Sequence, residues 1–180
     1  MNYFIQSLTY FRIIMGPILY VLITVFESFG LALFLFLIAA ASDYFDGYLA
    51  RKYNLVSLLG SVLDPIADKI LITFVILGLV LVLDSTYVGF MGCLILAREF
   101  WVAALRDMNS RNGNYSATEV TFLAKIKTTI QLLAMAGFLL GLYTNITIII
   151  FLSNFILFLA LIITIQTGLS YTIASLINKI

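Results

Sequence analysis

The chain has 180 residues, of which 63% are hydrophobic and 11% are charged, and its net charge is +1. A soluble domain carries about 25% charged residues, so this chain has too little polar surface to cover a water-exposed globule, and its charge gives no indication of nucleic-acid binding. There is no histidine, and Cys93 is the sole cysteine, which argues against a zinc site, a histidine-based triad or a disulfide framework. Any bound metal would need oxygen ligands, as Mg²⁺ and Mn²⁺ do.

Six apolar segments predict an all-α polytopic membrane protein, since one span needs about 20 mostly apolar residues. The connections between them are short, so successive helices should run antiparallel. The last segment is longer than the roughly 30 Å hydrocarbon core and should tilt or project beyond it. No linker suggests a second domain, so we expect one domain over residues 1–180. The predicted spans are residues 5–26, 30–51, 57–83, 87–109, 119–142 and 146–177.

The distribution of charge predicts the orientation in the membrane. Glu27 and Asp84 mark one side, which has no lysine or arginine. Because basic residues remain cytoplasmic, both termini should face the cytoplasm, in agreement with an even number of spans. The small size and the lack of a targeting segment favour a bacterial inner membrane. The basic residues at or near the cytoplasmic side are Arg51, Lys52, Arg106, Arg111, Lys125, Lys127 and Lys179.

Four aspartates fall where a charge is unfavourable. Asp43 and Asp46 lie near the end of the second predicted span, and Asp64 and Asp68 lie inside the third. Each ionised residue at mid-membrane costs roughly 2.5–3.5 kcal/mol. The spacings of three and four residues put each pair on one helix face, and the antiparallel course brings both pairs to a similar depth near the cytoplasmic side. A bound divalent cation would neutralise them.

Other interpretations of these acids exist. They could form buried ion pairs with Lys69, Arg98 or Arg106, or they could line the ion path of a cation transporter. A purely structural membrane scaffold is disfavoured, because it has no use for four such acids. We favour the metal site, because the acids lie on facing stripes.

Small residues lie between the two acid pairs, at Gly47, Ala50 and Gly60. Their lack of side-chain bulk would let a flat base or a pyrophosphate approach the backbone, or would let two helices pack closely. The spacing alone favours neither interpretation.

These same positions carry a family signature. Residues 43–68 contain the pattern D-x-x-D-G-x-x-A-R-x8-G-x3-D-x3-D, with all eight defining positions matched. This is the motif of the CDP-alcohol phosphotransferases, and the sequence therefore resembles that family. The resemblance implies a six-helix membrane fold, usually dimeric, with a polar cavity that opens to the cytoplasm.

The resemblance also implies roles for the motif residues. The four aspartates would hold two divalent ions, Mg²⁺ or Mn²⁺, over the pyrophosphate of a CDP-linked donor. Asp68 would both contact metal and act as the catalytic base that accepts the proton of the attacking hydroxyl. Arg51 would contact phosphate, and the cytidine slot would be formed by Gly47, Ala50 and Gly60.

Three further stretches resemble phosphatidylglycerophosphate synthases, a branch of this family. They are residues 96–100 with 105–106 (L-A-R-E-F and L-R), residues 124–131 (A-K-I-K-T-T-I-Q), and residues 8–12 with Pro17 (L-T-Y-F-R). The N-terminal stretch implies a donor contact at Thr9. Two departures are Ala124 in place of the usual glycine and Gln6-Ser7 in place of the usual Pro-Asn. The likeness spans about residues 6–135.

The implied reaction transfers the phosphatidyl group from CDP-diacylglycerol to sn-glycerol 3-phosphate. The family also offers inositol phosphate, serine and phosphatidylglycerol as alternative acceptors. A phosphate dianion needs a cationic pocket, in which arginine gives bidentate recognition and lysine a point charge. For Lys125 and Lys127, anchoring to lipid headgroups is an alternative role, and Glu99 would orient one of the bases. The predicted acceptor-binding residues are Arg98, Arg106, Lys125 and Lys127.

Overall fold

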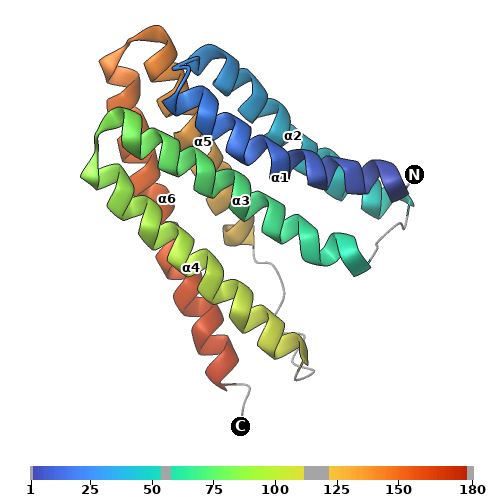
Figure 1. Cartoon of the computed structure of the whole chain (residues 1–180). Helices are drawn as coiled ribbons and strands as arrows, with labels where there is room; N and C mark the ends of the chain where they lie inside the picture. Colours follow the sequence, from blue (N-terminus) through green and yellow to red (C-terminus); the bar gives the residue numbers. More distant parts are fainter. Residues whose placement is uncertain (1, 54–57, 112–121, 178–180) are drawn as a thin grey trace.

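The computed structural model describes residues 2–53, 58–111 and 122–177, and within these ranges the chain forms six helices and no strand (Figure 1). The side chains of residues 2–6, 43–53, 58–62, 122, 124, 125 and 177 lie outside this description. The helices are α1 (Asn2–Thr24), α2 (Phe29–Tyr53), α3 (Leu58–Leu83), α4 (Thr86–Arg111), α5 (Phe122–Thr144) and α6 (Thr147–Ile177).

Each predicted span is one helix, and the predicted bounds differ from the observed ones by three residues or fewer. Five helices are long and apolar enough to cross a membrane, and the described apolar part of α2 runs over Phe29–Ser42. Large apolar side chains such as Phe34, Phe90 and Phe151 are exposed on the outside of the bundle, where lipid rather than water would surround them. The prediction of an all-α polytopic membrane protein is confirmed.

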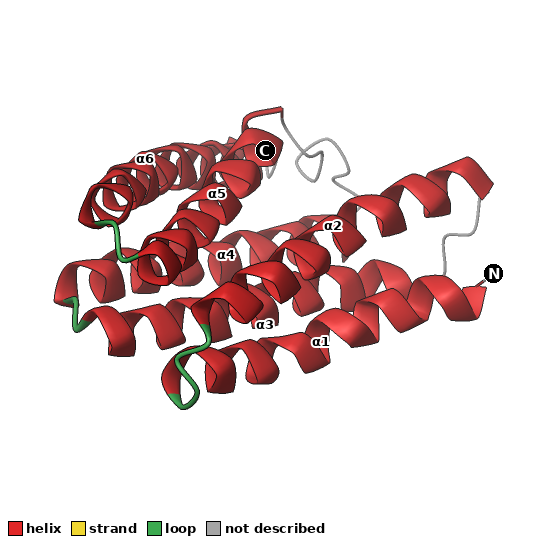
Figure 2. Cartoon of the chain, turned by 90° about the horizontal axis from the view of Figure 1, so that it is seen from above, coloured by secondary structure: helices red, strands yellow, loops and turns green. Residues whose placement is uncertain are grey.

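Tight turns join three helix pairs at one end of the bundle (green in Figure 2). Each turn contains one residue with a left-handed backbone: Glu27 (φ 48°), Asp84 (φ 45°) and Asn145 (φ 55°). This conformation lets the next N–H turn back onto the ending helix, as when the Ser85 N–H donates to the carbonyl of Val80 at 3.4 Å. Such bonds satisfy carbonyls that the helix end would otherwise leave unpaired.

The six helices pack as a closed ring. Around the ring the order of the helices is α1, α2, α5, α6, α4 and α3, and α3 closes the ring against α1. Helix α3 also contacts α5 across the ring. Close approach of α5 to α6 depends on Gly137 and Gly141, because a Cβ at Gly137 would lie 2.3 Å from Ser153 Oγ. Figure 1 shows the helices close together at the turns and spread apart toward the end where α1 begins and α6 ends.

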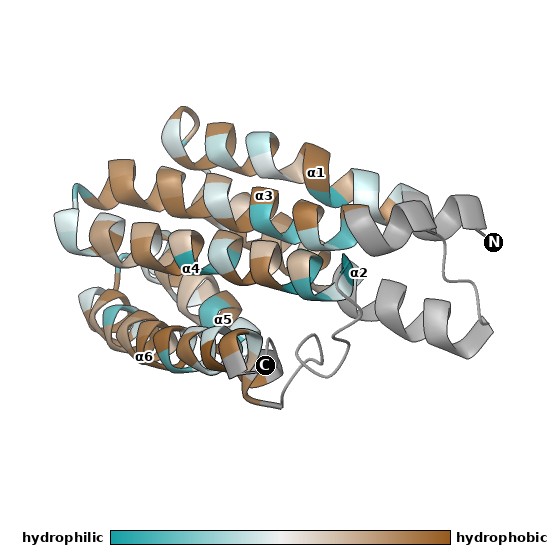
Figure 3. Cartoon of the chain, turned by 90° about the horizontal axis from the view of Figure 1, so that it is seen from below, coloured by the Kyte–Doolittle hydropathy of each residue, from teal (hydrophilic) through white to brown (hydrophobic). Residues whose placement is uncertain are grey.

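The interior changes character along the bundle axis. The buried apolar core lies in the half near the turns, where it includes Ile23, Phe36, Leu79 and Phe138. In the other half many buried residues are polar or charged, and hydrophilic colours gather there in Figure 3. The buried polar residues of that half include Thr9, Arg12, Asn109, Lys127, Gln131 and Thr167. A polar interior in the half where the helices spread provides the setting for a functional site.

Candidate active site

An arginine on α1 pairs with two aspartates on α3. Arg12 is fully buried, and its Nη1 donates to Asp68 Oδ1 at 2.5 Å while its Nη2 donates to Asp64 Oδ1 at 3.3 Å. The Thr9 hydroxyl donates to the same Asp64 oxygen at 2.6 Å. Thus α1 holds one oxygen of each carboxylate, and Arg12 offsets part of their negative charge.

Helix periodicity and close packing produce this arrangement. Thr9 and Arg12 are three residues apart on α1, and Asp64 and Asp68 are four apart on α3, so each pair lies on one helix face. Gly16 lies one turn beyond Arg12, and a Cβ there would be 3.0 Å from the ring of Phe74 on α3. The absence of a side chain at Gly16 lets α1 approach α3 closely enough for these contacts.

The aspartates of α3 suit an oxygen-liganded metal. The side chains of Asp64 and Asp68 are 36% and 35% exposed despite their contacts with Arg12. Carboxylate oxygens that are one turn apart and partly exposed are ligands that Mg²⁺ and Mn²⁺ accept. Among the described side chains no three such ligands gather, and the side chains of Asp43 and Asp46 are not among them. The four-carboxylate site therefore stays a prediction. The partly exposed carboxylates of Asp64 and Asp68 are compatible with it.

The helical backbone agrees with the predicted depth of the acid pairs. Asp46 lies about two turns before the end of α2 at Tyr53, and Asp64 lies about two turns after the start of α3 at Leu58. Asp64 and Asp68 form ion pairs with Arg12, a cation that was not among the pairing partners expected from the sequence.

A cavity of about 490 Å³ opens between α3, α4, α5 and α6. Asp68 lines it together with three residues that the sequence predicted for acceptor binding, and Lys69 adds a further positive charge. The cavity therefore brings a carboxylate of the motif into one space with a group of cationic side chains. The predicted acceptor residues in its wall are Arg98, Arg106 and Lys127.

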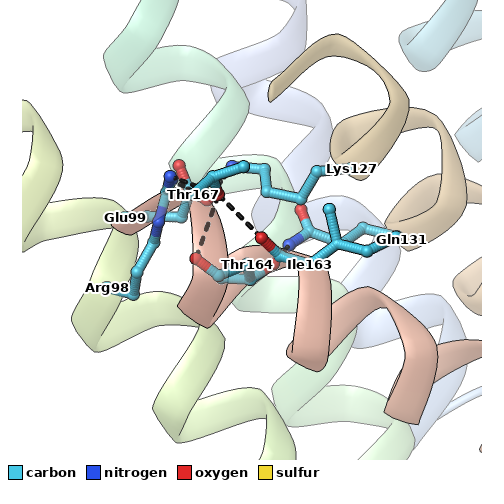
Figure 4. A network of polar contacts seen from close by, with 7 residues as sticks. All are labelled: Arg98, Glu99, Lys127, Gln131, Ile163, Thr164 and Thr167. Atoms are coloured by element: carbon cyan, nitrogen blue, oxygen red, sulfur yellow. Dashed lines mark hydrogen bonds and ion pairs between the residues drawn. The ribbon is translucent and has the colours of Figure 1, made fainter. Parts of the chain in front are cut away.

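Glu99 joins two of these cations. Its Oε1 accepts from Arg98 Nη1 at 3.2 Å and from Lys127 Nζ (Figure 4). The side chains of Arg98 and Lys127 are only 10% and 5% exposed, so a nearby carboxylate offsets charges that water reaches poorly. The prediction that Glu99 orients a basic side chain agrees with these contacts.

Helix α6 contributes polar groups that the sequence analysis missed. Thr167 Oγ1 accepts from Arg98 Nη2 at 2.7 Å, and Thr164 Oγ1 accepts from Gln131 Nε2 at 3.0 Å. Ser175 Oγ accepts from Asn109 Nδ2 at 2.6 Å. These α6 residues recur at helical spacing inside an apolar segment. That polar stripe is the signal that could have predicted a face turned to the site.

The family that bears the description CDP-alcohol phosphatidyltransferase matches residues 6–166. The chain belongs to this family. Its members are transferases and generally depend on a divalent metal.

Known relatives within the family are similar over most of this chain. A protein of Rickettsia felis is 39% identical over 168 residues, which are 91% of this chain and 90% of the relative. One of Rickettsia bellii is 43% identical over 76% of this chain and 74% of its own length. One of Escherichia coli K12 is 37% identical over 73% and 74%. Each of the three is named CDP-diacylglycerol–glycerol-3-phosphate 3-phosphatidyltransferase.

The structure of this CDP-alcohol phosphatidyltransferase does not describe the side chains of several predicted site residues. The roles of those residues therefore stay predictions. Thr9, predicted as a donor contact, lies beside Asp64. Arg12 was missed as a site residue. It is a charge inside the first predicted span, and like the four aspartates it therefore needs a partner or a function there. The residues outside the described side chains are Asp43, Asp46, Gly47, Ala50, Arg51, Gly60 and Lys125.

Proposed function

We propose that this protein transfers the phosphatidyl group of CDP-diacylglycerol to sn-glycerol 3-phosphate, which yields phosphatidylglycerophosphate and CMP. It would work as one catalytic domain in phospholipid biosynthesis. The observation that carries the proposal is the shared cavity, which Asp68 of the family motif lines together with Arg98, Arg106 and Lys127. The names of the three relatives support the same pair of substrates.

The donor would bind through the family motif. Its four aspartates would hold two divalent ions, Mg²⁺ or Mn²⁺, which when bound neutralise negative charge on the pyrophosphate and on the attacked phosphoryl group. Gly47, Ala50 and Gly60 would leave room for the cytidine, Arg51 would contact phosphate, and Thr9 would lie at the donor side of the site. Support for the metal role comes from the carboxylates of Asp64 and Asp68, which remain about one-third exposed. The proposed metal ligands are Asp43, Asp46, Asp64 and Asp68.

The acceptor phosphate would bind on the cationic wall of the cavity. Arg98 and Arg106 provide planar guanidinium groups that match phosphate oxygens, and Lys127 provides a point charge. Lys125, two residues before Lys127 on α5, would add a further charge. These groups would fix the dianion so that its free hydroxyl faces Asp68.

Bond making and breaking would follow from that position. The hydroxyl oxygen of the acceptor forms a new bond to the phosphorus that carries the diacylglycerol, and the bond from this phosphorus to CMP breaks. Asp68 takes the proton of the attacking hydroxyl as the new bond forms. The acyl chains of the donor would stay in the bilayer, because they are apolar, while its headgroup enters the cavity.

The same proposal includes the setting of the enzyme. In the described helices, the basic residues close to a helix end lie at the end of the bundle away from the three tight turns: Arg51, Lys52, Arg106, Arg111 and Lys125. Since basic residues remain cytoplasmic, both termini and the cavity would face the cytoplasm of a bacterial inner membrane. The enzyme would work there as a homodimer, as its family resemblance implies.

An acceptor assay tests the proposal directly. The purified protein in detergent would receive CDP-diacylglycerol, Mg²⁺ and, in separate reactions, glycerol 3-phosphate, inositol phosphate, serine or phosphatidylglycerol. We expect CMP release with glycerol 3-phosphate and little with the others. CMP release with another acceptor alone would replace the proposed substrate. Ion flux in liposomes without any CMP release would instead support a transporter and reject the proposal.

A further inference from the structure

The guanidinium of Arg98 is held from α6, outside the stretches that carry the family motifs. Its Nη2 donates to Thr167 Oγ1 at 2.7 Å. The Thr167 hydroxyl has its own acceptors in the helix backbone, the carbonyls of Ile163 at 2.8 Å and Thr164 at 3.0 Å (Figure 4). Because the hydroxyl hydrogen is directed into the helix, the lone pairs of its oxygen are left to accept from Arg98.

Two neighbours of Thr167 complete a cradle around Arg98. A Cβ at Gly168 would lie 2.9 Å from Arg98 Cγ and 3.1 Å from its Nε, so a larger residue here would require the Arg98 side chain to move. The ring centre of Tyr171 lies 5.9 Å from Arg98 Cζ, which is within the range of a cation–π contact. We call Thr167, Gly168 and Tyr171 the Arg98 cradle.

The cradle restricts a side chain that faces the cavity. Arg98 is 10% exposed, and Glu99 engages its Nη1 from the other side at 3.2 Å. Its buried Nε makes no hydrogen bond to the described residues. A guanidinium that is held by packing and by partners on two sides loses little rotamer freedom when an anion binds to it.

We infer that the Arg98 cradle is a positioning element for the acceptor phosphate, so that α6 sets the affinity for the acceptor without contacting the reacting atoms. The inference rests on the proposed function. It assigns a role to residues 167–171, which lie beyond the family match at residues 6–166. The chemical class recognised is a phosphate monoester dianion.

Steady-state kinetics of two substitutions test the cradle. Gly168→Ala should push Arg98 away from its position, and Thr167→Val should remove the acceptor oxygen while keeping the side-chain shape. Each should raise KM for glycerol 3-phosphate roughly tenfold or more. In both variants kcat and KM for CDP-diacylglycerol should change much less. Thr167→Ser keeps the hydroxyl and should retain a KM near that of the wild type.

A matched control separates positioning from helix packing. Gly137→Ala also drives a Cβ into α6, 2.3 Å from Ser153 Oγ, but this contact lies outside the cavity wall. It should lower thermal stability without a selective change in KM for glycerol 3-phosphate. If Gly168→Ala behaves in the same way as this control, the cradle is only structural and the inference fails.

The remaining outcomes are equally decisive. Wild-type CMP release with glycerol 3-phosphate, together with an unchanged KM in Thr167→Val, would overturn the cradle and leave the proposed function standing. If Gly168→Ala does not fold, the comparison of Thr167→Val with Thr167→Ser decides alone. If the wild type does not use glycerol 3-phosphate at all, the proposed function fails and the cradle fails with it.

Discussion

Arg12 is a buried cation between two carboxylates that remain partly exposed. It contacts Asp68 at 2.5 Å and Asp64 at 3.3 Å, and it has no exposed surface of its own. A charge in such a position is favourable only when it is paired. The two aspartates, one turn apart, would repel each other without it. Arg12 therefore has the position of an internal counter-ion for the acids that are proposed to bind metal.

Replacement of Arg12 should make the protein more dependent on divalent metal for its stability. In Arg12→Met the two carboxylates lose their counter-ion, so the free energy of unfolding in EDTA should fall by about 1–3 kcal/mol. Added Mn²⁺ should then raise the melting temperature more than it does in the wild type, because a ligand that binds only the folded state stabilises it. Thermal unfolding in detergent, with EDTA or with Mn²⁺, measures both effects.

Arg111 provides the control for this measurement. It pairs with Asp107 at 2.9 Å on the surface of α4, and their side chains are 78% and 62% exposed. Exposed pairs of this kind contribute less than about 1 kcal/mol, so Arg111→Met should melt close to the wild type in both conditions. An equal Mn²⁺ response in Arg12→Met and the wild type would show that Arg12 does not offset these acids.

At the scale of the helices, the three tight turns use residues other than glycine in a left-handed conformation. Asn and Asp tolerate this conformation better than other residues with a Cβ, which suits Asn145 and Asp84. Glu27, with a φ of 48°, has no such advantage. The turn between α1 and α2 therefore contains local strain that glycine would relieve.

Substitution by glycine should stabilise the turns in a definite order. Glu27→Gly should raise the free energy of unfolding by up to about 1 kcal/mol, and Asn145→Gly should gain less. Neither substitution should alter CMP release, because both turns lie at the end of the bundle away from the cavity. Thermal unfolding and the acceptor assay measure the two effects. Destabilisation by Glu27→Gly would contradict the assignment of strain, and Ser28→Gly serves as the neighbouring control.

Polar contacts also join α4 to α6 along their length. Besides the Arg98–Thr167 contact, Trp101 Nε1 donates to Thr172 Oγ1 at 3.0 Å and Asn109 Nδ2 donates to Ser175 Oγ at 2.6 Å. Hydrogen bonds between membrane helices contribute roughly 0.6 kcal/mol each on average. Their larger consequence here is that they fix the position of α6 along the axis of α4, and therefore which residues of α6 lie beside Arg98.

At the scale of the whole molecule, the two halves of the bundle differ in composition and in charge. The half near the turns has an apolar core, and the other half holds the cavity, whose lining includes Lys69, Arg106 and Lys127. Basic residues remain on the cytoplasmic side of a membrane. The asymmetry of the bundle is therefore also a prediction of its orientation.

Cysteine labelling can measure this orientation. In a Cys93→Ser background, Thr144→Cys at the turn end should react with a membrane-impermeant maleimide added to intact spheroplasts. Arg111→Cys, at the opposite end of α4, should react only after the membrane is opened. Both positions are exposed in the structure, so access depends on the side of the membrane. The reverse labelling pattern would mean that the cavity faces outward.

The amino-acid sequence alone predicted the helices and part of the site. Apolar runs bounded by polar residues determine where each span begins and ends, because span length and hydrogen bonding within a helix are local properties. Spacings within one helix likewise determine that Asp64 and Asp68 share a face. Arg98, Arg106 and Lys127 were predicted from their charge and from stretches that resemble phosphatidylglycerophosphate synthases, and the structure places all three in the wall of one cavity.

Only the tertiary structure decided which of these faces meet. Arg12 is 52 residues from Asp64, and Arg98 is 69 residues from Thr167. Their contacts depend on the order of helices around the ring and on close approach at Gly16 and Gly168, neither of which a local pattern contains. A polar residue inside an apolar helix indicates that a partner is needed. Which helix supplies that partner is settled by packing.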